Sequence, residues 1–446
     1  MLTIGIDIGT TTISAAVLEY QEEVKGKIEK KLLASKTVSN DSFVPTERKW
    51  ERVQNPAVLV RDAKKLLDEL LDHYPKVEAI GLTGQMHGVV YVNREGKNVS
   101  PLYTWEDGRG DLPGADGESA VSWIQKHLRI PAASGYGLVT HLYHCREKQV
   151  PVGSEKICTI ADYLGMCLTG RKEPLIHAGN AASLGFYDTK AWRFQESLIA
   201  EAGMDRHILP ETTDEIEILG FYRGIPVTVA LGDNQASFLG SVGMEKEVWQ
   251  VNAGTGGQIS VLSERHFEAP GIEARPFLEH TWLLTGAVLC AGRAYAILEH
   301  FFRSCAKAMG LEEKEQYGLM NQLAALAVRD AGGLEIDTCF QGTRTNPALR
   351  GRILGISETN LLPENLVLGV LKGIVREYYG FFQAIHEGTG LKVEKLIGSG
   401  GALRKNPALR QAFQDMFRAE LALTDIPEEA ACGAAVSAGM YLTAIR

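Results

Sequence analysis

Short apolar, β-prone runs alternate along this chain with polar turns that are rich in glycine and threonine. Two of the turns are nearly alike: Asp7-Ile8-Gly9-Thr10-Thr11 in the first half and Asn252-Ala253-Gly254-Thr255-Gly256 in the second. Each lies between two apolar runs, which are Leu2 to Ile6 and Ile13 to Leu18, then Val248 to Val251 and Ile259 to Leu262. The pattern predicts strand, tight turn and strand, made twice, and therefore two related halves.

Helices and strands alternate after the first hairpin, which favours an α/β fold. Asn55-Pro56 has the composition of an N-cap followed by proline, and the helix is predicted to reach about Tyr74. A buried strand is expected from Val77 to Leu82 and another from Pro226 to Leu231. A helix should begin near Asp233, and we expect the domain boundary close to residue 240.

The second half is predicted to be mainly helical, with helices within Gly292 to Asp330 and Pro363 to Glu387. A strand at Leu396 to Ile397 leads into the turn Gly398-Ser399-Gly400-Gly401-Ala402. The last helix is expected to begin at Gly433-Ala434-Ala435, where small residues permit close backbone approach.

The composition is that of an ordinary globular protein: 446 residues, 45% hydrophobic and 23% charged, with a net charge of −9. Nothing resembles the basic patch of a nucleic-acid-binding protein. The seven cysteines form no C-x-x-C pair, which argues against a disulfide framework or a zinc site. The stretch from Trp282 to Phe302 is apolar but interrupted by charges, and Lys25 to Lys31 is predicted to be a solvated hairpin tip. Because no signal-peptide pattern occurs, we expect a cytoplasmic protein. We also expect a monomer or homodimer without membrane or nucleic-acid partners.

The first of the two similar turns is a candidate for phosphate binding. Gly9 would let the backbone approach a phosphate closely, and the hydroxyls of Thr10, Thr11 and Thr12 would add donors. Asp7 suits a Mg²⁺ ion held through water, because Mg²⁺ prefers oxygen ligands and keeps much of its hydration shell. The alternative is an ordinary β-hairpin, since Asp-x-Gly-Thr is also good turn chemistry.

Asp233 is a candidate general base, because it stands between a buried strand and a helix, where α/β folds place ligands. Its carboxylate could accept the proton of a hydroxyl that attacks phosphorus, and Asn234 could contact the same substrate. The alternative is an aspartate that caps the helix.

Two further segments carry groups that suit a polyol. In the turn Gly84-Gln85-Met86-His87-Gly88, Gln85 and His87 could bind hydroxyls and Met86 could line an apolar wall, although a lone histidine is often structural. In the segment from Thr104 to Arg109, an indole could cover the C–H face of a sugar beside polar groups, and the residues concerned are Trp105, Asp107 and Arg109. The alternative is a loop anchored by Trp105 with a surface Asp107–Arg109 ion pair.

Glycine-rich segments of the second half are candidates for nucleotide binding. Backbone without side chains at Gly400, Gly401 and Ala402 would let a flat adenine lie against the chain, with Asn406 nearby. The alternative is a strand-to-helix turn in which glycine serves packing. The second of the two similar turns, with Gly254, Thr255 and Gly256, is a candidate for phosphate binding like the first, and Gly292 is a further candidate for nucleotide binding.

These segments, in this order and over essentially the whole chain, resemble the FGGY carbohydrate kinases. Asp-x-Gly-Thr-Thr is similar to the family's first phosphate motif and Gly254-Thr255-Gly256 to its second. Gly232-Asp233 resembles the catalytic-base motif and Gly400-Gly401-Ala402 the adenosine motif. Gly369 to Gly373 resembles the start of the C-terminal signature helix.

The resemblance implies an α/β fold of two actin-like, ribonuclease H-like ATPase domains with a ligand cleft between them. Residues 1–240 would carry the sugar site, the first phosphate hairpin and the base, and residues 241–446 the second hairpin and the adenosine site. It also implies that Asp233 deprotonates a sugar hydroxyl, that Asp7 serves Mg²⁺, and that ATP is the phosphoryl donor.

Within the family, Gln-Met-His-Gly resembles the ketose kinases, and Asn180-Ala181-Ala182-Ser183 resembles sedoheptulokinases, with xylulose or another pentulose as the alternative substrate. Ala161, the Gly-Ser-Gly-Gly start of the adenosine segment and the short chain depart from the family pattern. A rival from another class is an actin-like ATP-binding regulator, which would not need Trp105 or His87.

Overall fold

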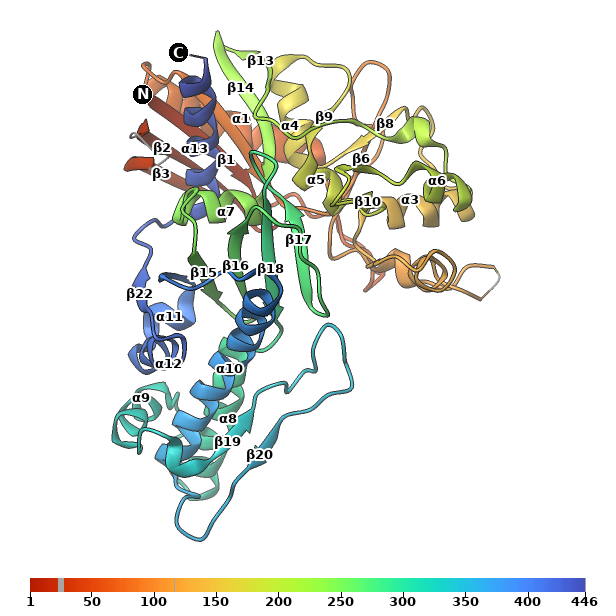
Figure 1. The fold of residues 1–446 in the computed structure, drawn as a ribbon. Coiled ribbons are helices and arrows are strands. Elements are labelled where there is room, and N and C mark those ends of the chain that lie inside the picture. Colours follow the sequence, from red (N-terminus) through yellow and green to blue (C-terminus); the bar gives the residue numbers. More distant parts are fainter. Residues whose placement is uncertain (23–27, 116, 446) are drawn as a thin grey trace. The chain divides into compact units, whose positions relative to one another are not determined.

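The protein is described by a computed structural model that covers residues 1–22, 28–115 and 117–445 (Figure 1). The chain divides into two compact units. Unit 1 comprises Met1–Met244, Arg275–Thr281 and Ile426–Arg446, and unit 2 comprises Glu245–Ala274 and Trp282–Asp425. In the described ranges, no helix is both long and apolar enough to cross a membrane.

Unit 1 is built on a six-stranded sheet with the order β13-β14-β5-β1-β2-β3. Its strands are β1 (Leu2–Ile8), β2 (Thr12–Glu22), β3 (Ile28–Ser39), β5 (Ala79–Gly84), β13 (Ile218–Tyr222) and β14 (Ile225–Gly232). The β1–β2 and β2–β3 pairs are antiparallel, whereas β1 and β14 both run parallel to β5. The sheet confirms the predicted first hairpin. Part of the tip predicted at Lys25 to Lys31 falls outside the described residues, and β3 begins at Ile28.

Helices cover both faces of this sheet. The helices of unit 1 are α1 (Pro56–His73), α2 (Ala120–Trp123), α3 (Gly137–Arg146), α4 (Ile160–Thr169), α5 (Ala178–Ser183), α6 (Glu196–Glu201), α7 (Asp233–Ser241) and α13 (Glu429–Ala444). Figure 1 shows α13 beside β1, with α7 packed against α13, and α1 and α4 pack on the opposite face. Asn55 caps α1 as predicted, accepting a hydrogen bond from the N–H of Ala57.

The approach of α13 to the sheet explains why glycines occur in β1 and β5. A Cβ at Gly5 would lie 1.9 Å from the carbonyl oxygen of Ala431, and one at Gly81 would lie 1.7 Å from that of Ala434. Glycine is therefore required at both positions for the helix to pack this closely. The helix begins at Glu429, four residues before the predicted start at Gly433.

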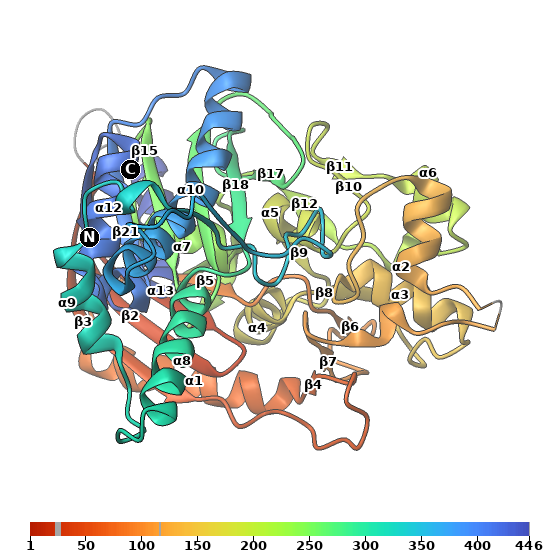
Figure 2. The ribbon, with the colours of Figure 1, turned by 90° about the horizontal axis from the view of Figure 1, so that it is seen from below.

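The rest of unit 1 is a group of short strands, short helices and helical turns from several stretches of the chain, at the right of Figure 2. It includes α2, α3 and α6, the strands β4 (Val53–Gln54), β6 (Val90–Val92), β7 (Leu102–Tyr103), β8 (Lys156–Cys158), β9 (Leu175–His177), β10 (Tyr187–Asp188), β11 (Arg193–Phe194) and β12 (Glu211–Thr213), and single turns at Gly108–Asp111, Ile124–Leu128 and Arg206–Ile208.

Unit 2 contains a sheet with the order β17-β18-β16-β15-β21-β22. Its strands are β15 (Val248–Ala253), β16 (Gly257–Ser263), β17 (Ile272–Pro276), β18 (Trp282–Val288), β21 (Lys395–Ser399) and β22 (Glu420–Leu423), with a separate pair β19 (Glu335–Asp337) and β20 (Arg352–Leu354). Its helices are α8 (Gly292–Ala308), α9 (Tyr317–Leu326), α10 (Pro363–Thr389), α11 (Gly401–Lys405) and α12 (Pro407–Phe417), and a short turn spans Ala331–Gly333.

The two sheets repeat one arrangement, which confirms the predicted related halves. The order β3-β2-β1-β5-β14 in unit 1 corresponds to β18-β16-β15-β21-β22 in unit 2. In both, the hairpin strands are antiparallel and the next two strands run parallel to the first. Duplicated sheets of this kind are the actin-like architecture that the sequence implied.

The division between the units differs in detail from the expected boundary at residue 240. Unit 1 extends to Met244 and recovers two later segments, Arg275–Thr281 and Ile426–Arg446. The second contains α13, which we expected in the C-terminal half. Its small residues pack on β1 and β5, so burial of this face assigns it to unit 1.

Candidate active site

Three neighbouring parallel strands of unit 1 end beside one another and carry the predicted catalytic groups. Asp7 lies in β1, Gln85 directly follows β5, and Asp233 directly follows β14. Gly84 is paired with Ile8 on one side and with Gly232 on the other. The sheet register therefore places Gln85 between the two carboxylates, at the carboxyl edge where α/β folds bind ligands.

Both carboxyl groups are poorly solvated. Burial, followed by the nearby Asp233 and Glu428, raises the pKa of Asp7 to about 8. Burial also raises the pKa of Asp233 to about 6, against the opposing effects of the Asn234 N–H, which donates to its Oδ1 (2.7 Å), and of Arg275. Oδ1 of Asp7 has no hydrogen-bond partner in the described part of the chain. Such a site stabilises a cation or a proton.

Asp233 does not act as the helix cap that we considered as an alternative. The N-cap of α7 is Gly232, and Asp233 is the first residue of the helix. Asp233 is partly exposed, and its carboxylate accepts a short-range hydrogen bond from the N–H of Asn234 rather than a capping bond from a later turn of the helix. A carboxylate that is not needed for capping can serve as a proton acceptor.

The sugar-side turn after β5 is held in an unusual conformation. His87 has φ = 70°, in the left-handed region that side chains rarely adopt. Its Nδ1 contacts the carbonyl oxygen of Ser183 (2.8 Å), and its ring stacks on Tyr136 with 4.8 Å between centroids. Met86 is buried, and its sulfur accepts a hydrogen bond from Asn234 Nδ2 (3.8 Å). The turn and the start of α7 are thus in direct contact.

The first hairpin turn is fixed by side-chain amides. Asn40 Nδ2 donates to the carbonyl oxygens of Gly9 (2.9 Å) and Thr10 (3.2 Å), and Gln54 Nε2 donates to that of Thr10 (2.9 Å). The indole of Trp105 donates to the hydroxyl of Thr10 (3.0 Å). The next two residues along the turn, Thr11 and Thr12, are exposed.

The second hairpin turn is held by the N-terminus of α8. The N–H groups of Gly292 and Arg293 donate to the carbonyl oxygens of Gly254 (2.9 Å) and Thr255 (3.0 Å). Within the turn, the N–H of Gly254 donates to the carbonyl of Gly256 (2.9 Å). Gly292, which sequence placed among the ATP-binding residues, is therefore adjacent to the predicted second phosphate turn.

Most of the predicted nucleotide-binding residues of unit 2 line one cavity of about 760 Å³. Those residues are Gly254, Thr255, Gly292, Gly401, Ala402 and Asn406. Gly400 adopts φ = 91°, and a Cβ there would lie 2.4 Å from the carbonyl oxygen of Ala253, so the turn needs glycine. Asn406 caps α12 through Oδ1, which accepts from the N–H of Leu409 (3.0 Å).

Comparison with known proteins agrees with this arrangement. The model of the FGGY family of carbohydrate kinases, N-terminal domain, matches residues 2–240, and that of the C-terminal domain matches residues 250–442. The chain belongs to the FGGY family of carbohydrate kinases. It is an ATP-dependent sugar kinase.

The kinase has curated relatives of similar length. It is 25% identical to sedoheptulokinase of Mus musculus over 450 residues and 27% identical to sedoheptulokinase of Homo sapiens over 458 residues, covering 93% of each chain in both cases. Among solved structures, the xylulose kinase of Rhodospirillum rubrum superposes with a TM-score of 0.83 at 20% identity, over 99% of this chain and 90% of that one. That likeness shows the shared two-domain fold.

The Trp105 loop of the kinase differs from both interpretations of its sequence. Asp107 and Arg109 are buried rather than a surface pair, with Arg109 Nε donating to Asp107 Oδ1 (2.6 Å). The second carboxylate oxygen accepts from Arg109 Nη2 (3.1 Å) and from the N–H of Arg52 (2.9 Å). Because these polar atoms are engaged within the protein, the pair holds the loop, whereas Trp105 is half exposed, at 49%, and the adjacent Glu106 is also exposed.

A buried polar chain extends from this ion pair. Arg109 Nη1 contacts His144 Nε2 (2.7 Å), and Tyr91 Oη contacts Nδ1 of both His144 and His141 (3.0 Å each). Arginine can only donate, so Nε2 of neutral His144 accepts and its Nδ1 carries the hydrogen. Tyr91 then accepts from His144 and donates to His141. Burial lowers the pKa of His144 to about 3 and that of His141 to about 4.

Sequence reasoning missed several residues of the kinase site. Asn40 and Gln54 were not singled out, because an amide in a strand or before a helix has no pattern of its own. The cavity of about 760 Å³ is also lined by the stacked rings of Tyr295 and Tyr317, 6.0 Å apart, and by Asn321, which accepts from Tyr295 Oη (2.9 Å). They are identified because they line the same cavity as the predicted glycines.

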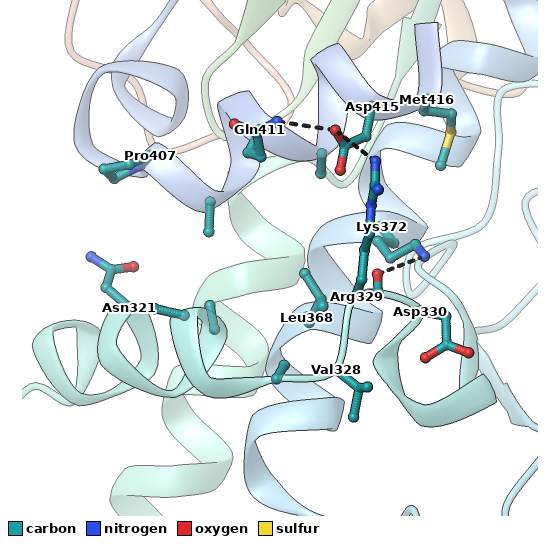
Figure 3. A pocket seen from close by; sticks show the side chains of 15 residues that line it. Asn321, Val328, Arg329, Asp330, Leu368, Lys372, Pro407, Gln411, Asp415 and Met416 are labelled. Carbon is teal, nitrogen blue, oxygen red and sulfur yellow. Dashed lines mark hydrogen bonds and ion pairs between the residues drawn. The ribbon is translucent and has the colours of Figure 1, made fainter. Parts of the chain in front are cut away.

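A second cavity of unit 2, about 1120 Å³, is lined by residues of α9, α10 and α12 (Figure 3). Figure 3 shows Arg329 beside Asp415 (3.6 Å), with Gln411 donating to the same carboxylate (3.0 Å). Lys372 donates to the carbonyl of Arg329 (3.3 Å). The cavity is lined largely by alanine, valine, leucine and methionine, and Lys372 of the predicted signature segment Gly369 to Gly373 also lines it.

Proposed function

We propose that this kinase transfers the γ-phosphoryl group of ATP to a terminal hydroxyl of a ketose, with sedoheptulose as the first candidate. The observation that carries the proposal is the position of Gln85 between Asp7 and Asp233 at the ends of three parallel strands. That arrangement brings hydroxyl-binding groups next to a proton acceptor and a second carboxylate. Phosphoryl transfer requires these groups chiefly for positioning and for neutralising charge.

Asp233 would accept the proton of the attacking hydroxyl. Its raised pKa, about 6, lets it remain ionised near neutral pH while being a stronger base than an ordinary aspartate. Asn234 and the buried Met86 would border the same hydroxyl, because they contact each other at the start of α7.

Asp7 would hold Mg²⁺ through water. Its Oδ1 has no partner among the described residues, and Asp233 and Glu428 raise its pKa, so the local field favours a divalent cation. When bound, Mg²⁺ would neutralise charge on the phosphates of ATP. The residues Gly9, Thr10, Thr11 and Thr12 would supply hydrogen bonds to a phosphate.

Adenosine would occupy the cavity beside Gly401, Ala402 and Asn406 in unit 2. The cavity of about 760 Å³ is of the size that small-molecule ligands fill. The ring of Tyr317 and the flat surface of the glycine turn suit an aromatic base. Gly254, Thr255 and Gly256 would contact the phosphates.

Sedoheptulose is favoured because the curated relatives at 25% and 27% identity are sedoheptulokinases that match 93% of this chain. A pentulose such as xylulose is the alternative, supported by a xylulose kinase of Lactococcus lactis at 24% identity. The resemblance of Asn180-Ala181-Ala182-Ser183 to the corresponding segment of sedoheptulokinases supports sedoheptulose. Asn180 Nδ2 donates to the carbonyl of Ala230 (3.1 Å), so this segment buttresses β14 beside Asp233.

The test is a coupled assay of ADP release with Mg²⁺ and ATP against sedoheptulose, xylulose, ribulose, glycerol and glucose. We expect the highest kcat/KM for sedoheptulose. A preference for xylulose or ribulose would retain the mechanism and reject the proposed sugar. No response to any sugar, with ATP still bound, would contradict the ketose proposal.

A further inference from the structure

Gln54 is a fully buried residue of β4 that contacts both the first phosphate turn and the sugar-side turn. Its Nε2 donates to the carbonyl oxygen of Thr10 (2.9 Å), and its Oε1 accepts from Nε2 of Gln85 (2.8 Å). One side chain therefore links two segments that are far apart in sequence and that are proposed to bind different substrates.

The contact with Thr10 has a counterpart in unit 2. There, the carbonyls of Gly254 and Thr255 are bound by the N–H groups at the start of α8. In unit 1, the equivalent carbonyls of Gly9 and Thr10 are bound by the amides of Asn40 and Gln54. In a trans peptide the C=O and the following N–H point in opposite directions. Hydrogen bonds that hold these carbonyls against the protein therefore direct the N–H group of each following residue away from it. Both hairpins thus present donors, by different means.

The contact with Gln85 fixes the direction of a substrate-side amide. The carbonyl of Thr10 can only accept, so it determines which end of the Gln54 amide faces it. Gln54 then offers only oxygen to Gln85, which must donate through Nε2. Oε1 of Gln85, an acceptor, is left without a partner among the described residues, although the side chain is only 3% exposed. A buried acceptor without a partner is costly unless a ligand satisfies it.

We propose that Gln54 is a positioning residue that orients the Gln85 amide, so that its oxygen accepts a sugar hydroxyl, and that holds the Thr10 peptide in its phosphate-binding orientation. The proposal deepens the proposed function and rests on it. It also assigns the two ends of one side chain to two different substrates, because Oε1 acts on the sugar side and Nε2 on the phosphate side.

Three variants separate the two ends. Gln54→Leu removes both contacts, and we expect the KM for the sugar to rise about tenfold, together with a lower kcat, because one hydrogen bond is lost on each side. Gln54→Glu keeps an acceptor for Gln85, and in its ionised form, at a pH above its titration, it cannot donate to Thr10. We expect it to lower kcat and raise the KM for ATP while the KM for the sugar stays within about twofold. Gln85→Leu removes the substrate-side amide itself.

The decisive comparison is the double variant Gln54→Leu/Gln85→Leu. If Gln54 acts on the sugar through Gln85, its substitution adds no further increase in the sugar KM once Gln85 is leucine. Asn98→Leu is the matched control for lost stability, since this partly buried amide donates to Ser100 (3.1 Å) and accepts from Tyr163 (2.9 Å) outside the proposed site. It should lower Tm and leave both KM values unchanged.

The outcomes separate this inference from the proposed function. Absence of sugar-dependent ADP release in the wild-type protein would reject the proposed function itself. Wild-type activity combined with unchanged KM values in Gln54→Leu and Gln54→Glu, or with additive effects in the double variant, would overturn the role of Gln54. If Gln54→Leu does not fold, Gln54→Glu still decides, because an unchanged kcat and an unchanged KM for ATP in that variant would overturn the role of Gln54 at Thr10.

Discussion

Asp233 adds to the larger effect of burial in raising the pKa of Asp7, although Asp7 lies in β1 and Asp233 follows β14, and these strands are separated in the sheet by β5. The parallel register brings their ends together on either side of Gly84. Two poorly solvated carboxylates in one place cost free energy in the absence of a cation or a proton. Fold stability alone would favour replacing one of them, and the proposed roles in binding Mg²⁺ and accepting a proton would use both carboxylates.

Replacement of Asp233 by asparagine should reduce kcat by about 10²–10⁴-fold, the usual contribution of a general base. Asparagine has nearly the same shape but cannot accept a proton under these conditions. The KM for ATP should change little, since the nucleotide cavity lies among residues of unit 2. Steady-state kinetics with varied ATP and sugar provide the measurement. Turnover at the wild-type rate would remove Asp233 from the role of base.

Gly401→Val tests the adenosine site. A Cβ at Gly401 meets nothing within 4 Å, so the protein should tolerate the substitution, yet the residue lines the nucleotide cavity. We expect a KM for ATP at least tenfold higher, an unchanged KM for the sugar and an unchanged Tm. An equal effect on both substrates would indicate that the cavity does not hold the nucleotide.

Gly81→Ala should destabilise unit 1 strongly. The new Cβ would lie 1.7 Å from the carbonyl oxygen of Ala434, so α13 must shift, and overpacking of this kind costs roughly 1–3 kcal/mol or more. Gly380→Ala in α10 is the control, because a Cβ there meets nothing within 4 Å and alanine favours a helix by about 0.5–1 kcal/mol. Thermal unfolding of both variants should show opposite shifts in Tm; a fall of similar size in both would refute the packing argument.

Stability should depend on pH through the buried histidines. The pKa of His144 is about 3 in the folded protein, because of burial and then of Arg109 and His141, against an ordinary value of 6.5. Below pH 6.5 the unfolded chain binds a proton that the folded chain does not, so the stabilisation present above pH 6.5 is lost as pH falls toward 3. At pH 5 the loss is about 2 kcal/mol for this one group.

His144→Gln keeps an acceptor for Arg109 and a donor for Tyr91 but does not titrate. Unfolding by urea at pH 7 and at pH 5 should therefore show a smaller loss of stability in the variant than in the wild-type protein. Equal losses in the two proteins would show that His144 does not contribute to acid sensitivity.

The fold was largely predictable because its signals are local. Local signals predict the strand before Asp7, the turn at Gly9 and the helix that begins after Asn55. The repeat of the hairpin pattern predicts two related sheets. The assignment of α13 to unit 1 was not predictable, because it depends on contacts of Gly5 and Gly81 with a helix more than 300 residues away.

The motif residues of the candidate site could be predicted from the sequence, but the contacts between distant segments could not. Glycines and carboxylates at strand ends have recognisable patterns. Most of them lie either at the ends of β1, β5 and β14 in unit 1 or along the cavity of about 760 Å³ in unit 2. The burial of Asp107 and Arg109 could not be seen, since a charged pair in a loop has the same sequence whether exposed or enclosed. The role proposed for Gln54 could not be predicted either, because it depends on contacts with Thr10 and Gln85, which are distant in sequence.

The most direct test of the central claim is ³¹P NMR of a reaction containing the protein, Mg²⁺, ATP and sedoheptulose, followed over time. The account predicts loss of the γ-phosphate signal with matching growth of ADP and of a phosphomonoester on a terminal carbon, slowed by at least about 10²-fold when Asp233→Asn replaces the wild-type protein. Formation of inorganic phosphate alone, or no loss of ATP with sedoheptulose or any pentulose, would contradict it.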